Sequence, residues 1–146
     1  VKSARKIPGL IAMCPQFDFL PPFYTISGIF DLYQVKNTAE ILGYLGTPPE
    51  TKVRALSGGK KRMLQVLLCL HLNRKFILLD EPFSQLAPVS VELISSVIQK
   101  QSRHSGILIT DHNHQEVSNL SDDLYLCHEG AVRVIEGGLE NSPYIS

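Results

Sequence analysis

Short apolar runs along the chain alternate with stretches in which apolar residues recur every three or four positions. The runs are typical of buried strands, which we expect at residues 10–14, 76–79 and 106–110. The three-to-four spacing predicts two helices between residues 25 and 45, then a helix after Ser57 and helices at 89–102 and 114–120. Two more strands are expected at 123–127 and 131–135. Strands that alternate with helices favour an α/β fold built on a parallel sheet.

One part of the chain departs from this alternation. Residues 20–70 carry helical spacing and no strand pattern, which predicts a helical subdomain inserted into the sheet. The last stretch, GGLENSPYIS, reads as a loose tail.

The composition narrows the function classes. The chain has 146 residues with 14 basic and 14 acidic side chains, so it has no global field that would attract nucleic acid, and we expect no nucleic-acid partner. No apolar run approaches the roughly 18 residues that span a bilayer. The three cysteines lie singly in apolar surroundings, without metal-binding spacing, and are expected to be reduced and buried.

Polar residues follow three of the predicted strands: Gln16, the pair Asp80 and Glu81, and His112. Parallel sheets bind ligands beyond the carboxyl ends of their strands, so these residues are candidates for phosphate chemistry. Asp80 suits Mg²⁺ held through water, and Glu81 suits the orientation or deprotonation of an attacking water. Each residue alone also has a structural interpretation: a strand-to-turn transition at Asp80, a hydrogen-bonded histidine at His112 and a solvated loop residue at Gln16.

The turn formed by Ser57, Gly58 and Gly59 precedes a long apolar helical stretch. Two residues without side chains let a ligand approach backbone amides, and the N-terminus of the following helix favours anions. A helix cap with a tight turn would explain the same residues. Both interpretations stay open on these residues alone.

Four segments, in this order, resemble the nucleotide-binding domain of ABC ATPases. They are MCPQ (the Q-loop), LSGGKKRMLQ (the family signature), FILLDEPFS (Walker B) and ILITDHN (the switch histidine). The resemblance extends from about residue 10 to 136. It implies a P-loop NTPase-like, RecA-like fold with a mostly parallel sheet, an inserted helical subdomain and a missing N-terminal portion.

The resemblance also implies a division of the chain into four parts. Residues 1–19 would end the N-terminal lobe and carry the Q-loop, and residues 20–73 would form the helical subdomain with the signature. Residues 74–136 would belong to the RecA-like core, with Walker B and the switch histidine, and residues 137–146 would be the tail.

By the same resemblance, two such domains pack head to tail and enclose ATP and Mg²⁺ between them. The signature of one domain would contact the γ-phosphate held by the other, through Ser57, Gly58, Gly59 and Lys60. Asp80 and Gln16 would support the metal. Glu81 would act on the water, and His112 would contact the γ-phosphate as the second catalytic residue.

The partner implied beyond the second domain is a transmembrane permease. The apolar residues that follow Gln16 are candidates for the groove that receives a permease helix: Phe17, Phe19, Leu20 and Phe23. The chain would then be the ATP-hydrolysing subunit of a transporter, coupling hydrolysis to solute transport. It would be cytoplasmic and peripheral on the inner face of the cell membrane.

Three departures from the family pattern limit this interpretation. The sequence G-x-x-x-x-G-K-[ST], which cradles phosphates in cis, is absent from these 146 residues, so the fragment alone is expected to be inactive. Lys60 stands where the signature usually has Gln or Glu, and Ala87 stands where the loop after Walker B usually has an acid. The alternatives are therefore a non-transport ABC ATPase of the translation or DNA-repair type, and a degenerate domain that only dimerises.

Overall fold

The computed structural model describes residues 7–135 and divides the chain after Asp111 into two compact units. The first contains a parallel sheet in the order β1–β2–β3, formed by Ile11–Cys14, Phe76–Asp80 and Gly106–Thr110. In the second, the helix α5 (His114–Leu120) precedes an antiparallel hairpin of β4 (Tyr125–His128) and β5 (Ala131–Val134). The predicted α/β fold with a mostly parallel sheet is confirmed. The two last strands, however, pair with each other.

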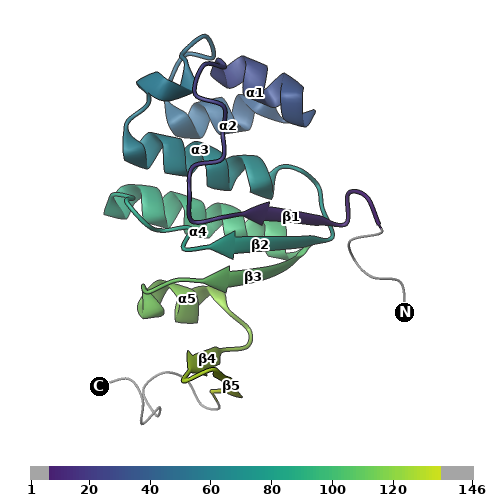
Figure 1. Cartoon of the computed structure of the whole chain (residues 1–146), viewed down its shortest axis with the longest axis vertical. Helices are drawn as coiled ribbons and strands as arrows, with labels where there is room; N and C mark the ends of the chain where they lie inside the picture. Colours follow the sequence, from purple (N-terminus) through teal and green to yellow (C-terminus); the bar gives the residue numbers. More distant parts are fainter. Residues whose placement is uncertain (1–6, 136–146) are drawn as a thin grey trace. The chain divides into compact units, whose positions relative to one another are not determined.

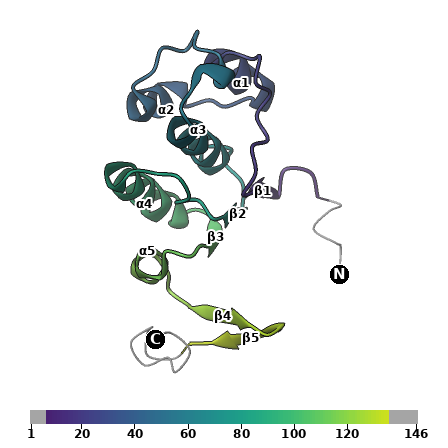
Figure 2. The same ribbon diagram turned by 60° about the vertical axis from the view of Figure 1, so that its left-hand side comes forward.

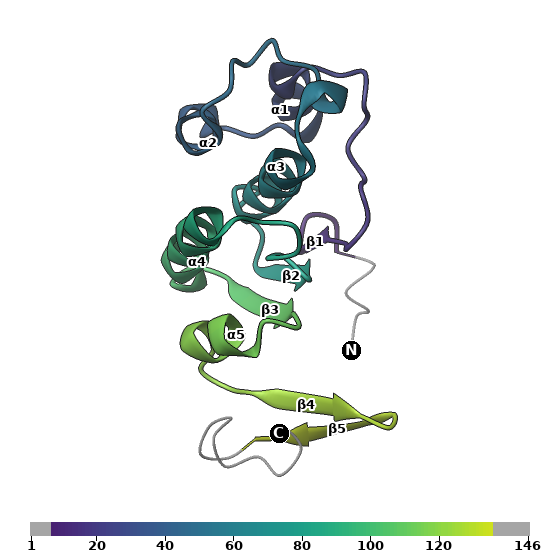
Figure 3. The ribbon, with the colours of Figure 1, turned by 90° about the vertical axis from the view of Figure 1, so that its left-hand side faces the viewer.

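Two helices cover one face of the three-stranded sheet. The helix α3 (Gly58–Leu70) packs on β1 and β2, and α4 (Pro88–Ser102) packs on β3 and on α3 (Figures 1 and 3). The strand residues that face these helices are buried, as Ala12 and Leu79 illustrate. This side of the sheet forms the core of the first unit.

The remaining helices lie beyond α3. They are α1 (Ile26–Tyr33), α2 (Thr38–Leu45) and a single 3₁₀ turn at Val53–Ala55 (Figures 1 and 2). Thr25 caps α1 by accepting a hydrogen bond from the amide of Gly28 at 3.0 Å. Gly46 ends α2 in the left-handed conformation, with φ of 54°. The division at residues 19/20 and 73/74 remains a prediction, and the predicted tail lies outside the described residues.

The helix α3 is buried on all sides along most of its length. Every residue from Arg62 to Leu70 is buried, because α2, α4 and the sheet surround this stretch. The three-to-four spacing predicted one apolar face. The structure instead shows a central helix that is surrounded by other elements. This explains why apolar residues occupy every face of α3 and not only the predicted one.

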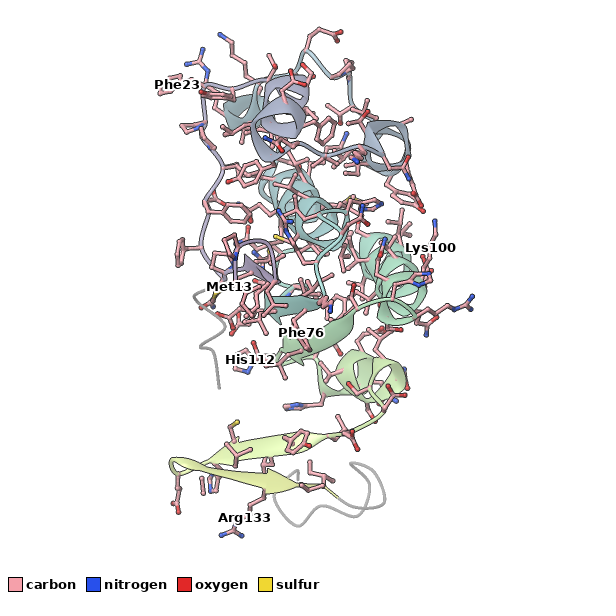
Figure 4. All side chains as sticks on the ribbon, turned by 90° about the vertical axis from the view of Figure 1, so that its right-hand side faces the viewer. Met13, Phe23, Phe76, Lys100, His112 and Arg133 are labelled. Atoms are coloured by element: carbon pink, nitrogen blue, oxygen red, sulfur yellow. The ribbon has the colours of Figure 1, made fainter. Side chains whose placement is uncertain are left out.

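The other face of the sheet carries exposed apolar side chains. Met13 is 57 % exposed and Phe76 50 % exposed, and both are labelled in Figure 4. Ile11 and Leu108 are exposed on the same face. The continuous apolar runs predicted strands buried on both faces. Within the described part of the first unit, the helices cover only one face.

The cysteine prediction is right for two thiols and wrong for the third. Cys14 and Cys69 are buried and reduced, whereas Cys127 is exposed. Cys127 lies in β4, a strand of a two-stranded hairpin, which has too little apolar surface to enclose a side chain.

None of the helices in residues 7–135 has both the length and the apolar character that crossing a membrane requires.

Candidate active site

The ends of β1 and β2 bring two of the predicted site residues together. The strands are parallel, with Cys14 opposite Leu79, so the residues that follow them leave the sheet side by side. There the Nε2 of Gln16 donates a hydrogen bond to Oε2 of Glu81 over 2.7 Å. Two of the polar residues that follow the predicted strands are therefore in contact, while their roles in catalysis and metal binding remain predictions.

Glu81 has an unusual backbone. Its φ is +51°, in the left-handed region, which a non-glycine residue adopts at a cost of about 1–3 kcal/mol. Its amide donates to the carbonyl of Thr110 at 2.7 Å, at the end of β3. This bond holds the carboxylate-bearing residue immediately beyond the sheet.

The neighbouring loop is held by β3 as well. The hydroxyl of Thr110 donates to Oδ1 of Asp80 at 2.6 Å, and Oδ2 of Asp111 accepts from the amide of Phe83 at 3.1 Å. The pattern of apolar runs did not identify Thr110 or Asp111 as part of this arrangement. The only signal was their position, at the end of a strand that lies next to β2.

Asp80 and Gln16 offer the type of ligand that Mg²⁺ prefers. Both present oxygen atoms, a carboxylate and an amide carbonyl, at adjacent strand ends. Gln16 uses its nitrogen toward Glu81, so the interaction that joins the pair does not consume the amide oxygen as an acceptor. In residues 7–135 there is no cluster of three or more His, Cys, Asp or Glu side chains arranged to enclose a metal. A magnesium ion here would therefore need water or phosphate oxygens to complete its coordination.

The turn at Ser57 begins α3. Ser57 is the N-cap, and its hydroxyl accepts from the amide of Lys60 at 3.3 Å. Ser57, Gly58 and Lys60 are exposed at this end of the helix. The Lys60 ammonium donates to the hydroxyl of Thr47 at 2.8 Å. A helix N-terminus formed by exposed residues, with a lysine beside it, is suited to an anion.

The two glycines also have a structural reason within the chain. A Cβ on Gly59 would lie 3.0 Å from the backbone carbonyl oxygen of Gln85, and one on Gly58 would lie 2.8 Å from the side-chain oxygen of the same residue. Gln85 has a φ of +62° in the loop after β2. The turn therefore packs against the loop that carries Glu81, a contact that the sequence pattern did not reveal.

His112, a predicted catalytic residue, and Ala87, which differs from the family pattern, each lie shortly before the first residue of a helix. His112 is the first residue of the second unit, where its carbonyl accepts from the amide of His114 at 3.0 Å; its catalytic role remains a prediction. Ala87 is the N-cap of α4, with no side-chain cap. An acid there would cap the helix, which alanine cannot do.

Arg62 joins the strand ends to α3, and sequence reasoning missed it. Its guanidinium donates to the carbonyl of Pro15 at 2.6 Å and to those of Asp80 and Glu81 at 2.5 and 3.1 Å. The only signal was an arginine at the start of a strongly apolar helix.

Two buried thiols lie near Arg62. A hydrogen bond with Cys69 lowers the pKa of Cys14, burial raises it, and the charge of Arg62 lowers it, with a lower pKa as the result. The same hydrogen bond and burial raise the pKa of Cys69.

The parallel sheet, with helices packed on one face and polar residues at adjacent strand ends, is an α/β fold of the P-loop NTPase-like type. Among solved structures, the fold is similar to an ATP-binding subunit of an ABC transporter, with a TM-score of 0.76 and 18% identity over 86% of this chain and 59% of that one. It is also similar, with a TM-score of 0.70 and 22% identity, to a chain in the complex of archaeal ribosomal stalk protein aP1 and archaeal ribosome recycling factor aABCE1, over 86% of this chain and 27% of that one. Transport and non-transport proteins therefore share this fold.

The profile of the ABC transporter family matches residues 2–84, more than half of the chain. The chain belongs to the ABC transporter family, and it corresponds to part of an ABC ATPase domain.

Curated relatives agree with this assignment. The lipopolysaccharide export system ATP-binding protein LptB of Acidithiobacillus ferridurans is 40% identical over 84 residues, which cover 57% of this chain and 35% of that protein. ABC transporter A family member 11 of Arabidopsis thaliana is 32% identical over 148 residues, which cover 92% of this chain and 15% of that protein. The chain spans about a third or less of the length of these relatives.

Proposed function

We propose that this chain forms the part of an ABC transporter's ATP-hydrolysing subunit that carries the catalytic glutamate and the signature. The observation that supports this most is the hydrogen bond between Gln16 and Glu81, which joins the two strand ends at which the chemistry would occur. Of the curated relatives named above, one is the ATP-binding protein of an export system and the other is an ABC transporter family member, which favours transport over the other uses of the fold.

Glu81 would act as the general base for the attacking water. Its carboxylate lies beyond the sheet, held by the backbone bond to Thr110 and by the side chain of Gln16. Asp80, whose Oδ1 is oriented by the Thr110 hydroxyl, would hold Mg²⁺ together with the amide oxygen of Gln16. Mg²⁺ bound there would neutralise negative charge that develops on the phosphate. His112 would contact the γ-phosphate.

The signature turn would bind the γ-phosphate of a nucleotide held by a second domain. Ser57 caps α3 and Gly58 and Gly59 are its first two residues; Ser57 and Gly58 are exposed, and Lys60 adds a positive charge at the same end. The phosphate-binding loop of that nucleotide would come from residues outside this chain. Two domains packed head to tail would complete two such sites.

The permease would dock near the start of the helical subdomain. Phe17 and Phe23 are each 71 % exposed, and the guanidinium of Arg54 lies 5.4 Å from the Phe23 ring centroid. The prediction of Leu20 as a contact residue is wrong, because its side chain is buried in the core. A complex of this kind would hold the subunit at the inner face of the membrane.

The test is ATP hydrolysis by the full-length protein with its permease, comparing the wild type with Glu81→Gln. Loss of the base is expected to lower kcat by at least about a hundredfold while ATP binding is retained. Glu92→Gln, at an exposed position of α4, is the matched control and should keep the wild-type rate. A wild type that hydrolyses no ATP with its permease would contradict the proposal and favour a domain that only dimerises.

A further inference from the structure

Arg62 is a buried charge that pairs with neutral oxygens. Its side chain lies in the first turns of α3, and the residue is 5 % exposed. Its four hydrogen bonds go to backbone carbonyls and to Oε1 of Gln65, at 3.2 Å. Within the described residues no carboxylate lies within ion-pair distance of it. Burying a charge without a counter-ion costs free energy. The hydrogen bonds that the Arg62 guanidinium makes to the chain must offset this cost.

The three carbonyls belong to the two segments that carry the proposed catalytic pair. Pro15 immediately precedes Gln16, and the other two carbonyls are those of Asp80 and Glu81 themselves. One planar guanidinium, with donors in a fixed fork, thus bonds the end of β1 and the end of β2 at the same time.

The two segments are not equally attached to α3. The β1 end has further bonds, because Asp18 accepts from Nε2 of Gln65 at 3.0 Å and pairs with Lys61 at 3.0 Å. The β2 end receives its side-chain hydrogen bonds from α3 through Arg62. The Glu81 segment should therefore depend on Arg62 more than the Gln16 segment does.

We propose that Arg62 is a positioning residue, which fixes Gln16 and Glu81 relative to each other and to the helix that begins with the signature turn. This inference rests on the proposed function for its link to hydrolysis, and on the hydrogen bonds alone for its structural part. Because Arg62 bonds both strand ends from within α3, and Ser57 caps the same helix, a shift of α3 would move both strand ends together.

The primary experiment uses the full-length protein without nucleotide and compares the wild type with Arg62→Met. Methionine fills a similar volume and donates no hydrogen bond. Hydrogen exchange of the amides of Glu81 and Ser84, which bond to Thr110 and to the Glu81 carbonyl, should accelerate by at least about tenfold, the factor expected from loss of charge-assisted bonds. The side-chain amide signal of Gln16, assigned by its loss in Gln16→Ala, should shift toward that of a solvated amide.

The matched control is Arg103→Met, at an exposed arginine that ends α4. It should change neither readout. Wild-type exchange at residues 80–84 in folded Arg62→Met would overturn the proposal. So would an increase spread evenly over α1 to α4, because that is the result of a purely structural role.

If Arg62→Met does not fold, the variant Arg62→Lys tests the proposal in its place. Lysine keeps the charge, but a single ammonium cannot reproduce the fork that reaches both segments. Faster exchange at residues 80–84 in this variant supports the proposal, and wild-type exchange together with a wild-type Gln16 signal overturns it.

A kinetic measurement then links the position to hydrolysis. In Arg62→Met or Arg62→Lys, kcat for ATP should fall about tenfold or more, while KM changes by less than about twofold. An equal rise in KM with kcat unchanged would overturn the inference. If the wild type hydrolyses no ATP, the proposed function fails, whereas the exchange experiment still decides whether Arg62 positions the two segments.

Discussion

Gln16 and Glu81 are joined by a 2.7 Å hydrogen bond although 65 residues separate them in the sequence. The bond exists because β1 and β2 are parallel neighbours and both residues follow the last paired positions. The role on water proposed for Glu81 requires a defined orientation of its carboxylate, and the hydrogen bond from the Gln16 amide contributes to it. The contact between Gln16 and Glu81 therefore supports a site at the ends of β1 and β2 better than either residue does alone.

Gln16→Ala should slow hydrolysis without preventing ATP binding. Removing the amide takes away one interaction that orients the Glu81 carboxylate and one oxygen of the proposed Mg²⁺ site, so kcat should fall by about ten- to a hundredfold. The Mg²⁺ concentration for half-maximal activity should rise. Steady-state ATP hydrolysis by the full-length protein, measured across a magnesium titration, checks this. Gln99→Ala, at an exposed glutamine of α4, is the control; a wild-type kcat in Gln16→Ala would refute the role.

Gly58→Ala and Gly59→Ala should differ in stability. Alanine in a helix gains about 0.5–1 kcal/mol over glycine, and at Gly58 the obstacle is only the movable side-chain end of Gln85. At Gly59 the obstacle is a backbone carbonyl at 3.0 Å, and crowding of that kind costs about 1–3 kcal/mol. We expect Gly58→Ala to be neutral to slightly stabilising and Gly59→Ala to be destabilised by about 1 kcal/mol in urea unfolding.

Gly43→Ala is the matched control for this pair. Gly43 lies within α2 and nothing lies within 4 Å of the added Cβ, so this variant should show the helix-propensity gain alone. Equal free energies of unfolding for all three variants would show that the loop after β2 accommodates a side chain at Gly59.

Periodicity predicted the helices and strands well, because their lengths and apolar spacing are local properties. It predicted the edge of the sheet at which Gln16 and Asp80 emerge, because parallel strands end at the same side. It did not predict the contacts that hold them. Thr110 contacts Asp80 and Glu81, and Gln85 contacts the turn at Gly58 and Gly59. These contacts depend on how the loops pack together, which local periodicity does not determine.

The helix α3 shows the limit most clearly. Its spacing predicted one apolar face, but burial from Arg62 to Leu70 results from the elements on all its sides. An arginine is normally exposed to solvent. Arg62 can be buried because backbone carbonyls that are distant in the sequence accept its hydrogen bonds. Such a residue can be found only when the ends of both strands have been placed.

Phe23→Asp should weaken association with the permease without unfolding the protein. Phe23 is 71 % exposed, so a charge there costs little stability but places a desolvated carboxylate in the proposed interface. The fraction of full-length protein that co-sediments with permease-containing membranes should fall about tenfold or more. Val89→Asp, at a side chain 76 % exposed on α4, is the control. Unchanged co-sedimentation would exclude this surface.

Phe19 provides a contrasting variant on the same segment. Its ring packs edge-on against Tyr33, with centroids 6.3 Å apart, so Phe19→Asp should lower stability as well as association. Thermal unfolding separates the two effects: the melting temperature should fall for Phe19→Asp and stay within a few degrees of the wild type for Phe23→Asp.

Glu40 joins α2 to the ends of α3 and α4 and should make stability depend on pH. It accepts from the ammonium of Lys100 at 2.7 Å and from the hydroxyl of Tyr44 at 3.0 Å, and its other oxygen lies 3.5 Å from Nε2 of His71. The Lys100 hydrogen bond is the main cause that lowers the pKa of Glu40 to about 2, against burial, with Tyr44 and the nearby positive charges adding to it.

The sign of the pH effect follows from the lowered pKa. The folded protein holds the Glu40 proton less tightly than the unfolded chain, whose value is near 4.5, so the stabilisation is fully present above that pH and is lost as the pH falls toward 2. Glu40→Gln should lower the free energy of unfolding by about 1 kcal/mol at pH 7, and the difference from the wild type should shrink between pH 4.5 and 2. Urea unfolding over this range measures it, with Glu50→Gln, at an exposed position, as control. A difference that stays constant over the same range would show that the ion pair contributes nothing to folding.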